Sequence, residues 1–264
     1  MTKRHTREEK MEAFGRLLDV LDELRVKCPW DRKQTNESLR PNTIEETYEL
    51  CDALMKGDDH EVMKELGDVL LHVAFYAKIG EEKEQFDMAD VCNALTDKLI
   101  FRHPHIYGTQ KADTEEQVLD NWEQIKQREK DGNKTVLAGV PRALPSLIKA
   151  YRIQDKASHV GFDWERREDV WQKVREEMGE LEAELERGDK QASEQELGDL
   201  LFAVINAARL YKLNADNALE MTNQKFIRRF NYIEQRSREL QKPMTEMTLD
   251  EMEALWQEAK NNKQ

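Results

Sequence analysis

One pattern of acidic residues occurs twice in this chain, and the second copy lies 131 residues after the first. Glu45-Glu46-x-x-Glu49 recurs as Glu176-Glu177-x-x-Glu180, and Glu65-Leu66-Gly67-Asp68 recurs as Glu196-Leu197-Gly198-Asp199. Because both parts of the pattern keep the same displacement, the chain is interpreted as a tandem duplication. The repeat predicts two similar domains, each folded around its own set of acids.

The segments around the acids have the apolar period of helices. No stretch alternates apolar and polar residues over the length of a strand, and the 264 residues include only 11 Gly and 6 Pro. The prediction is an all-α fold, a tandem repeat of two helical-bundle domains. The residues that carry the helical period are Leu66, Val69, Leu70 and Val73 in the first copy, and Leu197, Leu200, Leu201 and Val204 in the second.

Glycine, proline and polar residues gather between the two halves, where a linker is expected. The boundaries predicted from this cluster are an N-terminal helical domain over residues 1–130, a linker over 131–145 and a C-terminal helical domain over 146–264.

The charge and the cysteines restrict the partners and the compartment. A net charge of −13 argues against binding of long nucleic acids but not of a nucleotide that arrives with a divalent cation. Three cysteines make a disulfide framework improbable, and the charged N-terminus has no secretory h-region. The longest apolar run, residues 69–77, is interrupted by His72 and is too short to span a bilayer. We expect a cytoplasmic protein with no membrane segment.

Two glycines place the acids in space. Gly57 and Gly188 each have the context of a turn between two helices, and in both halves acids lie eight and eleven residues before and after the glycine. Equal distances from the turn of an antiparallel hairpin mean equal heights, about 12 Å and 16 Å along the axis. Four carboxylates therefore converge in each hairpin: Glu46, Glu49, Glu65 and Asp68 in the first, and Glu177, Glu180, Glu196 and Asp199 in the second.

Four carboxylates this close must bind protons or a cation. Ligands that are all oxygen suit Mg²⁺, with Mn²⁺ as a second candidate. A solvated acidic face is the simpler alternative, and Thr43-x-x-Glu46 also matches a helix capping box, which has no counterpart at Glu177. A di-iron centre would need a Glu-x-x-His motif on two helices; His72 lies one turn from Asp68, but its counterpart is Ala203.

Several basic and aromatic residues are candidates for contacts with phosphate or base. Lys225 and Arg229 form an i,i+4 pair, as do Lys98 and Arg102 in the first half, although such pairs also serve as partners of surface acids. Trp256 suits either base stacking or helix packing. Lys173 lies four residues before Glu177, where the first half has Asn42, so the additional cation favours the second half as the catalytic one.

The chain resembles the two-domain bacterial MazG family. The resemblance covers nearly the whole chain and rests on both acid patterns and on three further motifs: Cys28-Pro29-Trp30-Asp31-Arg32-Lys33-Gln34-Thr35, Arg102-His103-Pro104-His105 and Val160-Gly161-Phe162-Asp163-Trp164. We interpret the first of these as structural, with Pro29 ending a helix and Trp30 packing against the core.

The resemblance implies two all-α nucleoside triphosphate pyrophosphohydrolase domains, a homodimer, and Mg²⁺-dependent conversion of nucleoside and deoxynucleoside triphosphates to monophosphate and pyrophosphate. It further implies broad base specificity and a housekeeping role in the nucleotide pool. Glu177, Glu180, Glu196 and Asp199 match the family's metal ligands, with Glu46, Glu49, Glu65 and Asp68 as a second site; Glu176 or Glu177 is expected to orient the water. Lys173, Lys225, Arg229 and Trp256 match its nucleotide contacts. Ala192 stands where a lysine is common, and Lys190 is the candidate replacement.

Two alternatives remain open at the level of sequence. The first half, which lacks a cation at Asn42, also suits a nucleotide-sensing or protein-interaction module with weak or no catalysis. A helical scaffold with solvated acids would show no stabilisation by Mg²⁺.

Overall fold

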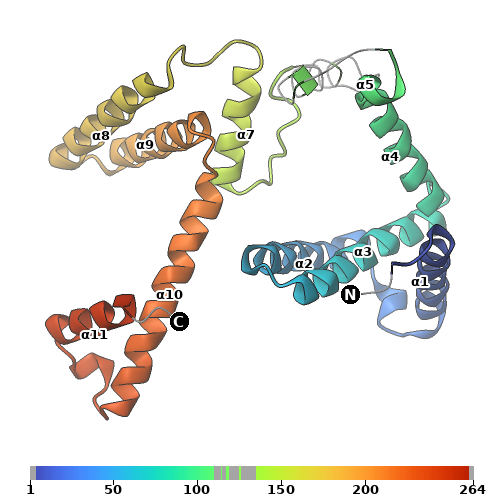
Figure 1. Ribbon diagram of the computed structural model, residues 1–264, viewed down its shortest axis with the longest axis horizontal. Helices are drawn as coiled ribbons and strands as arrows, with labels where there is room; N and C mark the ends of the chain where they lie inside the picture. Colours follow the sequence, from blue (N-terminus) through green and yellow to red (C-terminus); the bar gives the residue numbers. More distant parts are fainter. Residues whose placement is uncertain (1–3, 110–113, 115–116, 119–124, 126–134, 262–264) are drawn as a thin grey trace. The chain divides into compact units, whose positions relative to one another are not determined.

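The protein is described by a computed structural model that covers residues 4–109, 114, 117–118, 125 and 135–261 (Figure 1). These residues form helices and turns and no strand, which confirms the all-α prediction. The chain divides into two compact units, Met1–Ala112 and Asp113–Gln264. The predicted linker 131–145 falls within unit 2 and partly outside the described residues, so the domain boundaries stay a prediction. No helix in the described part of the chain is long and apolar enough to cross a membrane.

Unit 1 is built around a helix hairpin whose helices begin at side-chain caps. Thr35 caps α2 by accepting from the Ser38 N–H, and Asp58 caps α3 by accepting from two backbone N–H groups. Its elements are α1 (Arg7–Lys27), the 3₁₀ turn η1 (Asp31–Lys33), α2 (Asn36–Lys56), α3 (Asp59–Glu82), α4 (Met88–Arg102) and α5 (Pro104–Tyr107).

The core of unit 1 lies where α1 and α2 pack on α3. Leu18, Leu71, Tyr76 and Met88 extend the cluster, whose buried members are Leu21, Leu39, Ala74, Phe75 and Ile79. As expected, α1 ends just before Pro29. The prediction for Trp30 was wrong: this side chain is 57% exposed and does not fill the core. Pro29 restricts the direction of the backbone locally, but whether the Trp30 side chain packs into the core depends on the space that the helices leave there.

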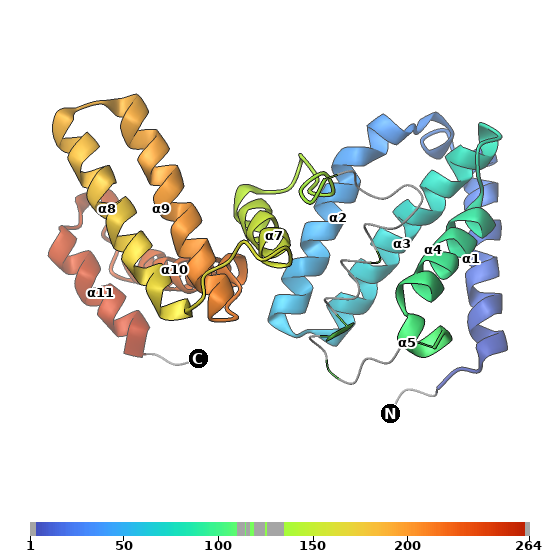
Figure 2. The same ribbon diagram turned by 90° about the horizontal axis from the view of Figure 1, so that it is seen from above.

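Unit 2 repeats the hairpin with different flanking helices. Figure 1 shows α11 packed against α10, away from the hairpin of α8 and α9, and Figure 2 shows the two hairpin helices side by side. Its elements are α7 (Ser146–Ser158), η2 (Arg167–Asp169), α8 (Val170–Arg187), α9 (Lys190–Leu210), α10 (Ala215–Glu239), η3 (Met244–Glu246) and α11 (Leu249–Asn261).

The two predicted turns are present in both hairpins. Gly57 and Gly188 end α2 and α8 in the left-handed conformation, with φ of 68° and 75°. Glycine adopts this conformation without the steric cost that a Cβ brings. Asp58 and Asp189 then cap the next helix in the same way. Each hairpin therefore reverses at the residue from which the heights of the acids were counted.

Candidate functional site

The hairpin of unit 2 brings three of its four predicted metal ligands together. Carboxylate oxygens of Glu177 on α8 and of Glu196 and Asp199 on α9 lie within 4.8 Å of one another. Glu180, one turn along α8, is outside this group. Partial desolvation, followed by the charge of Glu177, raises the pKa of Glu180. Oxygen donors at these distances fit one or more divalent cations that keep some bound water.

Lys173 neutralises part of this charge. Its Nζ lies 2.7 Å from Oε1 of Glu176 and 2.6 Å from Oε1 of Glu177. The hydrogen bonds to Glu176 and Glu177 raise the pKa of Lys173, so the side chain stays an ammonium. Glu177 is only 6% exposed, and without this cation its carboxylate would be buried among other acids.

Unit 1 holds an equivalent acidic group without an equivalent of Lys173. Oxygens of Glu46, Glu49 and Glu65 lie within 4.8 Å of one another. Asp68 is outside the group, but its charge, after burial, contributes to a raised pKa of Glu46. Burial raises the pKa of Glu65 as well. The nearest cation is Lys64, whose Nζ is 3.9 Å from Glu65.

The capping-box alternative for Glu46 is wrong. Helix α2 already begins at Asn36, so Thr43 lies inside the helix and caps nothing. Its hydroxyl donates to the Leu39 carbonyl and also contacts Nδ1 of His72 at 3.1 Å and the hydroxyl of Tyr76 at 2.6 Å. A Thr-x-x-Glu pattern does not by itself show where a helix begins, because the same residues also fit inside a helix that starts earlier.

His72 is a core histidine, as the absence of a counterpart suggested. It is buried, and burial lowers its pKa, which favours the neutral ring. Because it contacts Thr43 and lacks a Glu-x-x-His partner in the other half, nothing here supports an iron centre.

A cavity of about 830 Å³ opens beside the acids of unit 2. Lys173, Glu177 and Asp199 form part of its wall, and most of the remaining wall is apolar or aromatic. The wall also includes Gln154, Phe162, Asp163, Trp164, Phe202, Ala203, Asn206 and Arg209. The sequence indicated Phe162, Asp163 and Trp164 only as a motif and Ala203 only as the counterpart of His72, and it did not predict the cavity.

Comparison with known proteins assigns this arrangement to a family. The model of the MazG nucleotide pyrophosphohydrolase domain matches residues 34–107 and 166–233, which contain the two hairpins. The chain belongs to the MazG family. The two matched segments agree with the tandem repeat that the displaced acid patterns predicted.

Three relatives show how far the MazG similarity extends. The nucleoside triphosphate pyrophosphohydrolase of Escherichia coli K12 is 40% identical over 95% of this chain and 98% of its own length. The nucleoside triphosphate pyrophosphohydrolase/pyrophosphatase MazG of Thermotoga maritima is 39% identical over 94% of this chain and 95% of its own length. An uncharacterised Bacillus subtilis protein, YabN, is 43% identical over 96% of this chain but only 53% of its own length.

Three of the predicted MazG nucleotide contacts lie away from the acids. Lys225 and Arg229 are on α10 and Trp256 is on α11, and none of them lines the cavity. The Arg229 guanidinium carbon lies 5.3 Å from the centre of the Trp256 ring, and Phe226 packs on the same ring at 5.1 Å. Of the four predicted contacts, Lys173 is the one whose pairing with the predicted metal ligands is seen in the described part of the chain.

Lys190 does not take the place of the lysine missing at Ala192. It is the first residue of α9, its side chain is 90% exposed, and its nearest acidic partner is Glu194 at 3.9 Å. The cations that the described part of unit 2 offers to the acids are therefore fewer than the sequence pattern suggested.

Proposed function

We propose that unit 2 hydrolyses nucleoside and deoxynucleoside triphosphates to a monophosphate and pyrophosphate, with Mg²⁺ or Mn²⁺ held by its acids. The observation that carries this proposal is the acid cluster with its paired lysine on the wall of a large, mostly apolar cavity. Membership of the MazG family supplies the reaction class. The proposed ligands are Glu177, Glu180, Glu196 and Asp199.

Different residues of the site would serve different roles in the hydrolysis. The cation, when bound, polarises the phosphate oxygens and lowers the pKa of a coordinated water. Lys173 holds Glu176 and Glu177 side by side, so that one of these carboxylates can accept a hydrogen bond from the attacking water. Attack at the α-phosphorus breaks its bond to the bridging oxygen and releases pyrophosphate, which is why the products test the assignment.

Incubation with mixed nucleoside triphosphates and Mg²⁺ is expected to yield monophosphates and pyrophosphate, separated by ion-exchange chromatography. Excess EDTA should lower the rate at least about 100-fold, because it removes the main charge that balances the triphosphate, and added Mg²⁺ or Mn²⁺ should restore it. Diphosphate and inorganic phosphate as products would refute the proposed reaction. An EDTA-insensitive rate would refute the metal site.

We further propose that the protein accepts several bases, has a housekeeping role in the nucleotide pool and is located in the cytoplasm. The net charge of −13 supports a small anionic substrate carried with a cation over a long nucleic acid.

We also propose that the chain forms a homodimer in which each copy completes the site of the other. The apolar stripe at Leu197, Leu201 and Val204 remains exposed on α9, as does its counterpart on α3, and exposed stripes of this kind mark association surfaces. Nε of Arg229 is buried and makes no hydrogen bond among the described residues. Since Lys225 and Arg229 do not reach the acids of their own chain, their phosphate contacts would be made across the dimer.

Mixing two inactive variants tests this exchange. Glu180→Gln lacks a ligand and Arg229→Ala lacks a cation, and each is expected to be nearly inactive alone. A two-fold dimer formed from an equal mixture should regain about a quarter of the parent activity, because half of the dimers would carry one intact site. No recovery, in a mixture shown by mass spectrometry to contain mixed dimers, would place Arg229 in its own chain's site or outside catalysis.

Unit 1 suits a second role better than it suits turnover. Its hairpin has Asn42 in place of Lys173, and His72 and Tyr76 of α3 contact the hydroxyl of Thr43 on α2. We propose that it senses nucleotide or binds a protein partner, with weak or no catalysis.

A further inference from the structure

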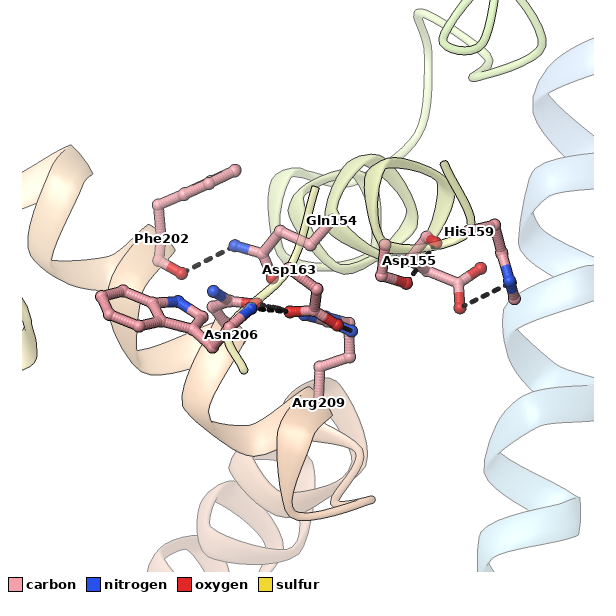
Figure 3. A network of polar contacts seen from close by, with 9 residues as sticks. Gln154, Asp155, His159, Asp163, Phe202, Asn206 and Arg209 are labelled. Carbon is pink, nitrogen blue, oxygen red and sulfur yellow. Dashed lines mark hydrogen bonds and ion pairs between the residues drawn. The ribbon is translucent and has the colours of Figure 1, made fainter. Parts of the chain in front are cut away.

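The loop between α7 and α8 is fastened to α9 on both sides, as Figure 3 shows. On the side of α7, Nε2 of Gln154 donates to the Phe202 carbonyl at 2.8 Å. On the side of α8, Arg209 donates to Asp163 from Nη1 at 3.0 Å and from Nη2 at 2.5 Å. The Arg209 side chain is 11% exposed and that of Asp163 is 26% exposed. Two parallel bonds between a guanidinium and a carboxylate fix both distance and orientation.

Neighbouring groups hold both partners of this ion pair. Oδ1 of Asn206, one turn earlier on α9, accepts from Nε of Arg209 at 3.1 Å and from Nη2 at 2.8 Å. The backbone N–H of Trp164 donates to Asp163 at 2.9 Å. Desolvation raises the pKa of Asp163, but the hydrogen bonds from Arg209 and Trp164 outweigh it, so this pKa is lowered. The pair is therefore ionised at neutral pH.

Tyr211, the residue after α9, adds two contacts to the segment that leads into α8. The guanidinium carbon of Arg167 lies 5.0 Å from the centre of the Tyr211 ring, and the centres of the Trp171 and Tyr211 rings are 6.1 Å apart. Cation–π and aromatic contacts of this kind are attractive at these distances. These contacts and the Asp163–Arg209 pair, together called the clamp, close the end of the hairpin opposite its turn.

The clamp lies about twice as far from the hairpin turn as the acids do. Asp199 is 11 residues beyond Gly188, and Arg209 is 21 residues beyond it. An opening of about 1 Å at the clamp would therefore move the acids of α8 away from those of α9 by about 0.5 Å. Functional groups of a site must be held to within about 0.5 Å of their working geometry. A small opening of the clamp is therefore enough to loosen a metal site.

The hairpin of unit 1 shows that the fold does not require this clamp. With the displacement of 131, Lys78 of α3 stands in the place of Arg209, and Gly80 stands in the place of Tyr211. Nζ of Lys78 lies 2.7 Å from Asp22 of α1. The same position on the hairpin therefore holds α1 in unit 1 and the segment before α8 in unit 2. The clamp accompanies the unit for which turnover is proposed.

We propose that Arg209 is a positioning residue for the metal site of unit 2. Through Asp163 it fixes the beginning of α8 on the end of α9. This sets the separation of Glu177 from Glu196 and Asp199. Metal held by the acids favours the closed clamp, and the closed clamp raises the affinity for the metal, because the two equilibria are linked. The inference rests on the proposed function, which assigns these acids to the metal.

Arg209→Lys keeps the charge of the pair and removes its two parallel bonds. The Kd for Mn²⁺ without nucleotide, measured by calorimetry in a Glu49→Gln background that weakens the site of unit 1, should rise. A rise of at least about 5-fold is expected, because loss of a residue bonded directly to a ligand costs about 10–100-fold and Arg209 acts from further away. The Mg²⁺ concentration for half-maximal rate should rise by the same factor. At saturating Mg²⁺, kcat should stay within about two-fold, because bound metal closes the clamp again.

Arg25→Lys is the matched control. Arg25 makes the same two parallel bonds in unit 1, to Glu82 at 2.7 Å and 2.8 Å, and its side chain is 10% exposed. This change should cost similar stability and leave the metal dependence of turnover unchanged. If circular dichroism shows that Arg209→Lys does not fold, Asp163→Asn removes one bond and the negative charge from the more exposed side of the pair.

Digestion with trypsin reports the state of the clamp without turnover. The peptide bonds after Arg166 and Arg167 lie in the fastened segment, and both side chains are exposed. Because cleavage requires this segment to leave α9, it should be at least about 5-fold faster in Arg209→Lys than in the parent. Mn²⁺ should slow it in both proteins. Mass spectrometry of the fragments identifies the cuts.

The outcomes separate the clamp from the proposed function. A parent that binds Mn²⁺ but releases no pyrophosphate refutes the function, while Mn²⁺ affinity and digestion still test the clamp. Unchanged Mn²⁺ affinity and cleavage rate in a folded Arg209→Lys protein overturn the inference. Equal effects of Arg25→Lys overturn it as well, since they would show a loss of stability alone. A lower kcat at saturating Mg²⁺ with an unchanged metal dependence overturns it in favour of a direct role of Arg209 in the reaction.

Discussion

Glu180→Gln is expected to lower triphosphate hydrolysis at least about 100-fold. Mutation of a residue that only hydrogen-bonds to a metal ligand typically costs about 10–100-fold in activity, and loss of a proposed ligand itself should cost more. Glu180 is exposed, so the isosteric amide should not disturb folding. Partial desolvation, followed by the charge of Glu177, raises the pKa of its carboxyl group. The amide removes the charge but keeps the shape. Steady-state kcat and the Mg²⁺ concentration that gives half-maximal rate measure the effect.

Glu49→Gln is the matched change in unit 1, at the same height in the other hairpin. We expect it to leave more than half of the turnover, since Lys173, the cation paired with the acids of unit 2, is replaced by Asn42 in unit 1. Equal losses in the two variants would show that both hairpins turn over substrate. Full activity of Glu180→Gln would remove Glu180 from the site.

Lys173→Met is expected to lower kcat/KM by about 30-fold or more, because loss of the cation that pairs with a buried carboxylate costs about 2 kcal/mol or more. It leaves Glu177 buried without its cation, 2.6 Å from where Nζ had been. The charge of Lys173 also lowers the pKa of Glu180, so without it that pKa should rise and the acidic limb of the kcat/KM profile should move to higher pH.

Lys242→Met is the control for this change. Its Nζ also bonds a carboxylate, that of Glu251 at 2.7 Å, and its side chain is 38% exposed against 39% for Lys173, but it does not line the cavity. Its rate and pH profile should match those of the parent. An unshifted profile in Lys173→Met would show that Lys173 does not control the ionisation of the acids.

The residues that sequence placed correctly are those fixed by local geometry. Gly57 and Gly188 end their helices in the left-handed conformation, and acids counted from them meet across each hairpin. Helical rise and the period of side chains decide such positions within one hairpin. Four carboxylates were predicted to converge in each hairpin, but only three in each have oxygens within 4.8 Å of one another. Asp68 and Glu180 lie outside these groups.

The misplaced residues depend on packing between elements. Trp30 was expected in the core and is exposed, and Thr43 was a candidate cap and lies inside α2. The i,i+4 pair of Lys225 and Arg229 was correctly seen as one face of a helix, but spacing along α10 says nothing about the distance from α10 to the acids.

The sequence by itself determined the duplication, the helical class, the two hairpins and the acids that face each other, because each depends on residues close along the chain. Only the tertiary structure revealed the cavity beside α7, the hydrogen bonds of the Gln154 and Asn206 amides on its wall, and the position of Arg229 and Trp256 outside that wall. These features follow from side-chain volumes summed over helices distant in sequence. At one pair of equivalent positions unit 1 has His72, which is buried and contacts Thr43, whereas unit 2 has Ala203, which lines the cavity.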